Sequence, residues 1–259
     1  MTTRKKIMLG ALVLLLSVLT VLVIHYRRAI SHYVSHELSH DDKLHLIRNF
    51  EVMSKHKGQS IGFDVSQYQG VIRWSQTDSV EGAFPLDFVF IRATAGRDLV
   101  DKYFHQNWQL AKNRPLIRGA YHYYRPDENS VEQAYNFIRT VKLEKGDFPP
   151  VLDIEQLPED QTLDSLKKGL KRWLWLVEKH YKVRPIIYSG DRFYNDFLRE
   201  DFPDYPAWIA NYNFFVENMN DGWSFWQFTD RGFVKGIDAD VDLNLYQGSR
   251  ADLDKLRIK

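Results

Sequence analysis

The sequence predicts an α/β fold in which eight strands form an incomplete, TIM-like β/α barrel, preceded by an N-terminal transmembrane helix. Residues 7–24 form one uncharged apolar stretch. From residue 61 onward, short β-rich runs alternate with amphipathic segments, which is typical of parallel strands joined by helical crossovers. The gaps at 212–223 and 229–240 are too short for full helices and contain glycine. These late gaps predict that the barrel lacks some of its outer helices.

The composition excludes several classes of function. The chain has 259 residues, 44% of them hydrophobic, which is enough for a sizeable core. A formal net charge of +1 creates no strong field that would recruit nucleic acid. The absence of cysteine excludes disulfides, thiol catalysis and cysteine–zinc sites. No phosphate-binding loop, serine nucleophile elbow or His–Glu metal motif is present, so we expect no metal and no cofactor. The oligomeric state stays open.

The N-terminal stretch predicts a membrane anchor. Three cations, Arg4, Lys5 and Lys6, precede the 18 apolar residues 7–24. As a helix these residues would span ~27 Å, close to the ~30 Å hydrocarbon core of a bilayer. A cleaved signal peptide has a shorter apolar region and a small-x-small cleavage site, whereas here residues 25–28 read His-Tyr-Arg-Arg. We interpret residues 1–28 as a single-pass anchor in the cell membrane, with the rest outside the cytoplasm. The alternative is a cleaved signal and a secreted or periplasmic protein.

Two further regions follow the anchor. Residues 29–58 are polar and rich in histidine, and we interpret them as a stalk between the membrane and the domain. Residues 59–259 then form the barrel domain. Three amphipathic segments predict helices between its early strands: Lys102–Lys112, Ser130–Val141 and Leu163–Tyr181.

Eight runs in the barrel domain have the composition of strands. They are Ile61–Val65, Phe88–Ala93, Ile117–Tyr124, Val151–Glu155, Pro185–Tyr188, Trp208–Asn211, Ser224–Phe228 and Val241–Leu245. Polar or aromatic residues stand at the ends of most of these runs. Because the carboxyl ends of parallel barrel strands meet at one mouth, we expect these side chains to build a site there.

Residues 151–155, Val-Leu-Asp-Ile-Glu, carry the strongest chemical signal. Side chains two residues apart in a strand point to the same face, so Asp153 and Glu155 would lie together. Two neighbouring carboxylates raise the proton affinity of at least one of them. Such a pair is unfavourable for folding and useful for acid–base chemistry.

The strand motifs together resemble one known family. They are Gly62-Phe63-Asp64-Val65-Ser66, Phe88-Val89-Phe90-Ile91-Arg92-Ala93-Thr94, Gly119-Ala120-Tyr121-His122-Tyr123-Tyr124, Pro150-Val151-Leu152-Asp153-Ile154-Glu155, Pro185-Ile186-Ile187-Tyr188-Ser189, Trp208-Ile209-Ala210-Asn211-Tyr212, Trp226-Gln227-Phe228 and Val241-Asp242-Leu243-Asn244. In this order, over residues 61–246, they resemble glycoside hydrolase family 25, the Chalaropsis-type lysozymes. Two positions depart from the family pattern: Arg92 stands where a lysine is expected, and Ala95 where the family often has an acid.

The resemblance implies a metal-free N-acetylmuramidase that acts on the glycan strands of peptidoglycan. It cuts the β-1,4 bond between N-acetylmuramic acid and N-acetylglucosamine, with Glu155 as the general acid. For Asp153 the roles of direct nucleophile, water activator and electrostatic helper stay open; we favour an Asp153 that orients the substrate's own N-acetyl group. Asp64 and Asp242, from the first and last strands, would face the cationic transition state or hold sugar hydroxyls.

Aromatic and amide side chains at the strand ends are candidates for binding sugar. Strand alternation allows only one of Tyr121 and His122 to face the barrel interior, and we expect His122 to be a core histidine with satisfied hydrogen bonds. Flat rings and amides suit sugar rings and acetamide groups. The expected sugar contacts are Tyr123, Tyr188, Trp208, Asn211 and Gln227.

Two other functions compete with muramidase activity. A non-catalytic wall-binding module would keep the cleft, but it would not need the Asp153–Glu155 pair. Hydrolysis of another N-acetylated glycan is compatible with the departures at Arg92 and Ala95.

Overall fold

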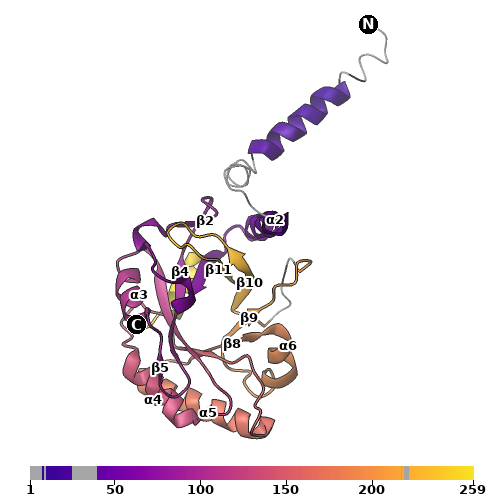
Figure 1. Cartoon of the computed structure of the whole chain (residues 1–259). Helices are drawn as coiled ribbons and strands as arrows, with labels where there is room; N and C mark the ends of the chain where they lie inside the picture. Colours follow the sequence, from indigo (N-terminus) through magenta and orange to yellow (C-terminus); the bar gives the residue numbers. More distant parts are fainter. Residues whose placement is uncertain (1–7, 9, 25–39, 217, 219–221) are drawn as a thin grey trace.

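The computed structural model describes residues 8, 10–24, 40–216, 218 and 222–259 (Figure 1). Its sheet runs in the order β1-β11-β10-β9-β8-β7-β6-β4-β5, and pairing of β1 with β4 closes all but the short β5 into a ring of eight strands. The ring strands are β1 (Ser60–Val65), β4 (Phe88–Ala95), β6 (Ile117–Tyr123), β7 (Val151–Asp153), β8 (Ile186–Gly190), β9 (Ala207–Ala210), β10 (Phe225–Gly232) and β11 (Val241–Tyr246). Each predicted strand is present, and the predicted barrel is confirmed.

Helices cover only part of the ring. The three predicted amphipathic segments are α3 (Phe104–Ala111), α4 (Ser130–Thr140) and α5 (Leu163–Tyr181). The described residues between β9 and β10, and between β10 and β11, contain no helix, which confirms that the barrel is incomplete. The remaining short elements are η1 (Gln67–Gln69), η2 (Trp74–Gln76), β2 (Ser79–Val80), β3 (Phe84–Pro85), β5 (Leu99–Val100), α6 (Asp191–Phe193), η3 (Tyr194–Leu198), α7 (Arg250–Leu253) and η4 (Asp254–Leu256).

One strand runs against the direction that strand–helix alternation predicts. β11 pairs antiparallel with both β1 and β10, whereas the other ring pairs are parallel. The gap before β11 is too short for a crossover, so the chain turns back instead. The start of β11 therefore lies at the mouth where the other strands end, and Asp242 pairs in register with Asp64.

The N-terminal region differs from the prediction. Residues 10–24 are helical, but no helix in the described part of the chain is long and apolar enough to cross a membrane. The expected transmembrane helix therefore has no support there. Residues 1–7, 9 and 25–28 of the predicted anchor, and 29–39 of the predicted stalk, lie outside the described residues.

The second half of the predicted stalk is α2 (His40–Lys55), which packs on β10 of the barrel (Figure 1). Its inner face carries apolar residues at helical spacing, and Leu46, Phe50, Val52 and Met53 are buried. Phe50 meets Phe84 edge to face, with ring centroids 5.1 Å apart. Polar residues around these four gave the stretch the composition of a solvated segment, although one of its faces belongs to the core.

Aromatic side chains fill the lower interior of the barrel. Phe90 stacks on Trp208 with ring centroids 4.5 Å apart, and Phe88 packs against Phe90 and Phe225. Glycines make room for this plug: a Cβ on Gly62 would lie 2.3 Å from the Phe88 ring, and one on Gly119 2.4 Å from the Phe90 ring. The plug fills the lower part of the barrel, below the mouth where the strands end.

We expect Gly62→Ala to destabilise the fold by about 1–3 kcal/mol, because Phe88 is fully buried and has no space into which to move. Gly190→Ala is the matched control, since no atom lies within 4 Å of the added Cβ. Urea denaturation measures both. Equal midpoints for the two variants would contradict the tight fit at Gly62.

We also expect the fragment 40–259 to be more stable than the fragment 59–259, which begins at the predicted start of the barrel domain. Loss of α2 exposes the barrel surface that its buried apolar residues cover, and each such large side chain contributes about 1.5–3 kcal/mol when fully buried. Thermal unfolding of the two fragments measures the difference. If both unfold at the same temperature, α2 is not part of the folded domain.

Candidate active site

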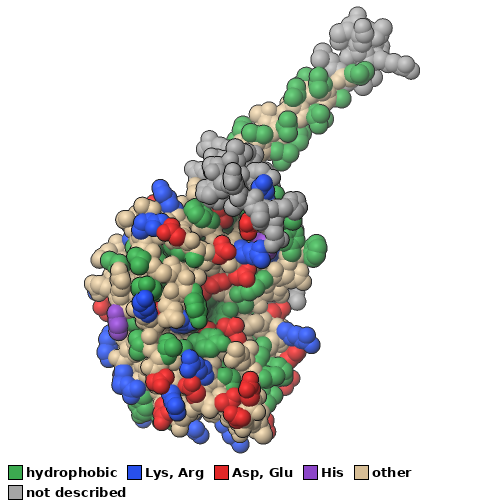
Figure 2. Space-filling model, viewed as in Figure 1, with side chains coloured by type: hydrophobic (Ala, Val, Ile, Leu, Met, Phe, Trp, Pro, Cys, Tyr) green, Lys and Arg blue, Asp and Glu red, His purple; other side chains and the backbone are tan. Residues whose placement is uncertain are grey.

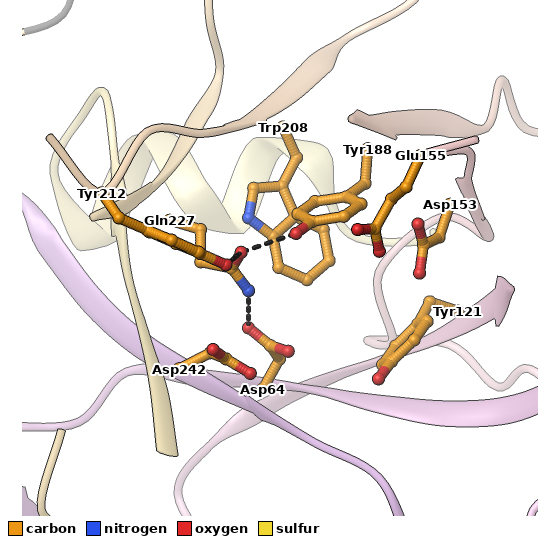
Figure 3. Close-up of a pocket in the computed structure, with 9 residues that line it drawn as sticks. All are labelled: Asp64, Tyr121, Asp153, Glu155, Tyr188, Trp208, Tyr212, Gln227 and Asp242. Carbon is orange, nitrogen blue, oxygen red and sulfur yellow. Dashed lines mark hydrogen bonds between the residues drawn. The ribbon is translucent and has the colours of Figure 1, made fainter. Parts of the chain in front are cut away.

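A cavity of about 170 Å³ opens at the mouth of the barrel, where the inward side chains of seven ring strands and the segments that follow two of them meet (Figure 3). Its lining consists of Asp64, Tyr121, Asp153, Glu155, Tyr188, Trp208, Tyr212, Gln227 and Asp242. The space-filling view shows acidic side chains grouped along a hollow in the middle of the viewed face (Figure 2). All four predicted catalytic carboxyls are therefore in one place.

Strand alternation explains how this lining forms. On β7 and β10 an apolar residue faces the plug, and the residue two positions later faces the cavity. Val151 precedes Asp153 in this way, and Phe225 precedes Gln227. The plug thus forms the floor of the cavity, and the polar layer forms its walls.

Asp153 and Glu155 lie side by side and face the same space (Figure 3). Between them, Ile154 is fully buried; its N–H donates to the Tyr188 carbonyl at 3.1 Å, and its carbonyl accepts from Ser189 Oγ at 2.6 Å. These bonds fix the backbone just beyond β7. Both carboxyls consequently emerge on the cavity side.

The two carboxyls differ in burial. Asp153 is buried, and its burial and the neighbouring charge of Glu155 raise its pKa well above the ordinary value. Glu155 is exposed as a residue, and partial desolvation of its carboxyl raises its pKa above the ordinary value as well. Because the two carboxyls lie side by side, ionisation of one disfavours ionisation of the other. Because Asp153 is the more buried of the two residues, burial favours a proton on Asp153 more than on Glu155.

A second carboxyl pair lies across the cavity. Asp64 Oδ2 accepts hydrogen bonds from Gln227 Nε2 at 2.7 Å and Asn244 Nδ2 at 2.8 Å. Burial raises the pKa of Asp64 to about 7. The pKa of Asp242 is raised to about 9 by burial and by the charge of Asp64. Asp64 is therefore held by side chains of β10 and β11 and is not a local turn cap.

Three of the predicted sugar contacts line the cavity, but their polar groups are largely paired with one another. Gln227 Oε1 accepts hydrogen bonds from the hydroxyls of Tyr188, at 2.6 Å, and Tyr212. Trp208 is buried, and its Nε1 donates to Asn244 Oδ1 at 2.7 Å. Gln227 and Trp208 are therefore held in place, and they present a preformed wall and floor.

Two other predicted contacts, Tyr123 and Asn211, are not among the residues that line the cavity. Tyr123 is half-buried nearby; partial burial and the charges of Glu155 and Asp153 raise its pKa. The Asn211 side chain donates to Asp191 Oδ2 at 2.9 Å and accepts from the Asn213 N–H at 3.0 Å. These bonds organise the loop after β9, and the role of Asn211 as a sugar contact stays a prediction.

Tyr121 and Tyr212 line the cavity although they were not among the selected contacts. His122 is fully buried on the outer side of β6, where its ring nitrogens pair with Thr94 Oγ1 at 2.7 Å and Gln133 Oε1 at 3.1 Å. Its prediction as a core histidine is confirmed. Alternation then places Tyr121 inward, so the sequence contained a signal for it. Tyr212 follows the end of β9, where alternation gives no signal.

The departure at Arg92 brings a cation close to the acids. Its Nε donates to Asp101 Oδ2 at 3.0 Å, and its guanidinium carbon lies 4.9 Å from the centre of the Tyr68 ring. The charge of Arg92 opposes the rise in the pKa of Asp153.

Among the described residues, no group of three or more His, Asp or Glu residues is arranged to hold a metal ion.

Comparison with known proteins places this geometry in a family. The model of glycosyl hydrolases family 25 matches residues 63–237. The uncharacterized protein YegX of Escherichia coli K12 is 37% identical over 97% of this chain and 94% of that protein. Lysozyme M1 of Streptomyces globisporus is 32% identical over 74% of this chain and 69% of that enzyme.

Among solved structures, a family 25 glycosyl hydrolase from Bacillus anthracis superposes with a TM-score of 0.70 and 30% identity, over 78% of this chain and 95% of that one. Sequence and fold agree over the barrel that carries the carboxyls. The chain belongs to family 25 of the glycosyl hydrolases.

Proposed function

We propose that the chain is a muramidase that hydrolyses the β-1,4 bond between N-acetylmuramic acid and N-acetylglucosamine in peptidoglycan, with Glu155 as general acid. Membership of family 25 and the likeness to lysozyme M1 support the reaction. The observation that carries the assignment of Glu155 is the pairing of an exposed carboxyl with a buried one at the mouth of the barrel. A glycosidic oxygen leaves as a neutral hydroxyl only if an acid protonates it, and only an exposed carboxyl can reach that oxygen.

Substrate binding would move the shared proton to the residue that uses it. A sugar lying over Glu155 removes water from its carboxyl and so raises its pKa further. An acetamide N–H that donates to Asp153 stabilises the ionised form of Asp153. Both effects shift the proton from Asp153 to Glu155, which is then ready to donate it.

The reaction then follows the substrate-assisted route. The acetamide oxygen of the sugar attacks the anomeric carbon while the bond to the leaving oxygen breaks, and Glu155 gives its proton to that oxygen. Ionised Asp153 holds the acetamide N–H and balances the positive charge that develops on the acetamide. Water then attacks the anomeric carbon, the bond between that carbon and the acetamide oxygen breaks to restore the acetamide, and Glu155 takes a proton from the water.

The second carboxyl pair and the tyrosines would bind sugar hydroxyls. Asp242 lies across the cavity from Glu155, and the Gln227 amide already holds Asp64. A neutral Asp242 donates a hydrogen bond, whereas an ionised Asp64 accepts one. Together they can therefore donate to the oxygen of a sugar hydroxyl and accept its hydrogen. Tyr188 and Tyr212 present ring edges and hydroxyls on the adjoining wall.

Peptidoglycan lies outside the cytoplasmic membrane, so this function requires export. We propose that the apolar stretch 7–24 supplies it, either as a retained anchor or as a signal that is cleaved.

We expect Glu155→Gln in the full chain to lower kcat on purified peptidoglycan by about 10²–10⁴-fold, because the amide cannot give up a proton. Mass spectrometry of released fragments measures new reducing ends on muramic acid. Glu200→Gln, an exposed glutamate outside the cavity, is the matched control and retains parent activity. Binding without cleavage by the parent would instead indicate a wall-binding module, and cleavage confined to another N-acetylated glycan would assign a different substrate.

Asp153→Asn separates the two roles of that residue. An asparagine still hydrogen-bonds an acetamide but carries no charge, so we expect kcat to fall while KM changes little. Kinetics on the same substrate test this. A large rise in KM at unchanged kcat would place Asp153 in binding alone.

We expect the free energy of unfolding to decrease as the pH rises from about 4 toward 9, because the folded protein holds protons on Asp64 and Asp242 that the unfolded chain releases near the ordinary carboxyl pKa. Below the ordinary carboxyl pKa both states are protonated, so the stabilisation is fully present and no longer changes with pH. The stabilisation is lost as the pH passes the raised values of about 7 and about 9. Thermal unfolding across this range measures the effect. Asp242→Asn should flatten the curve, and an unchanged slope in that variant would contradict the protonated Asp242.

A further inference from the structure

Arg48 on α2 binds the loop that forms one wall of the cavity. Its side chain is buried and donates to four backbone carbonyls: Nε to Phe214 at 3.2 Å, Nη2 to Asn213 at 3.0 Å and Val216 at 3.3 Å, and Nη1 to Phe228 at 2.6 Å. Among the described residues, no carboxylate forms an ion pair with it. A guanidinium with backbone carbonyls as its only partners fixes the path of the main chain.

The bond to Phe228 lies at an irregularity of β10. The register between β10 and β11 shifts between Gln227 and Thr229, so Phe228 is the extra residue of a bulge. A bulge leaves the extra residue outside the ladder, and Arg48 takes up its carbonyl. Gln227, immediately before it, points into the cavity, so Arg48 is anchored next to a residue of the site.

The other three bonds hold residues 213–216, directly after Tyr212. The Tyr212 hydroxyl donates to Gln227 Oε1, and Gln227 Nε2 donates to Asp64 Oδ2. A chain of contacts thus leads from α2 through the loop to the carboxyl pair. The same loop carries Phe214 and Phe215, which are 41% and 88% exposed.

We propose that Arg48 is a positioning residue: it holds residues 211–216 against β10 so that Tyr212 and its two phenylalanine neighbours form a fixed wall for the glycan. The proposal rests on the proposed function of the cavity. It assigns a role in substrate binding to a helix that lies before the span matched by the family model, residues 63–237. Lysine could not replace Arg48. The three guanidinium nitrogens donate to carbonyls in two different segments, residues 213–216 and Phe228, and a single ammonium group cannot reach both.

A neighbouring residue supplies the matched control. Asn49 Nδ2 donates to the Arg231 carbonyl at 2.9 Å, so it also ties α2 to β10, but among the described residues its side chain forms no hydrogen bond with residues 213–216. Arg48→Met and Asn49→Ala both weaken the docking of α2. Only Arg48→Met releases the loop.

The experiment uses the full chain with Arg48→Met, Asn49→Ala, Tyr212→Phe and the double variant Arg48→Met/Tyr212→Phe, assayed well below their unfolding temperatures. We expect Arg48→Met to raise KM for peptidoglycan about tenfold with kcat within about twofold, since β7 and its two carboxyls are untouched. Asn49→Ala should leave KM unchanged. In the Tyr212→Phe background the effect of Arg48→Met should shrink, because both changes act on one wall.

Amide hydrogen exchange gives a readout independent of activity. Residues 212–216 should exchange faster in Arg48→Met than in the parent, and at the parent rate in Asn49→Ala. Equal exchange of this segment in both variants, equal KM effects in both, or full additivity with Tyr212→Phe would overturn the proposal. If the parent releases no reducing ends, the proposed function fails instead, and the exchange comparison alone decides whether Arg48 holds the loop.

Discussion

Four carboxyl groups share one small cavity, and they cannot all be ionised at neutral pH. Burial makes each negative charge unfavourable, and each charge makes the next more so. The protein resolves this conflict by pairing the acids: Asp153 with Glu155 on one side, and Asp64 with Asp242 on the other. Burial and the neighbouring charges raise the pKa of the acids and so favour one proton in each pair. A site with both donors and acceptors at neutral pH therefore arises from carboxyl groups alone.

The barrel architecture makes this pairing possible. The aromatic plug below the cavity blocks water from the lower side, so the acids are desolvated from beneath and open only at the mouth. The antiparallel β11 brings Asp242 into register with Asp64. With a parallel last strand, the residues at its start would lie at the opposite end of the barrel, and this second pair would not form.

The strands and the acids could be predicted from the sequence because both follow from period-two alternation and short motifs. Alternation predicts that Asp153 and Glu155 lie side by side without any knowledge of distant partners, and both line the cavity; their catalytic roles stay proposals. Alternation does not predict the direction of β11, which depends on the length of a turn and not on the strand itself. For Asn211, nothing in the local sequence distinguishes an amide that faces a ligand from one that organises a loop.

The predicted stalk, residues 29–58, also shows that local sequence does not reveal contacts with distant parts of the chain. A stretch that is polar on average can still bury one face, and α2 does so through a few apolar residues and the buried Arg48. The partners of Arg48 are backbone carbonyls some 165 to 180 positions away in the chain, so no local pattern could reveal them. Charge and composition show that a segment can be exposed to solvent, whereas its contacts with distant residues determine whether it packs on the domain.

The unequal burial of Asp153 and Glu155 makes the two carboxyls differ in how strongly they hold a proton. If both were equally buried, the shared proton would have no preferred position and no means of reaching a substrate oxygen. Because Asp153 is enclosed and Glu155 is open, a bound sugar changes the surroundings of Glu155 more than those of Asp153. Binding itself can then set the protonation state. This requires that the glycan be held firmly over Glu155, which is the task of the opposite wall formed by Tyr212 and the loop that α2 supports.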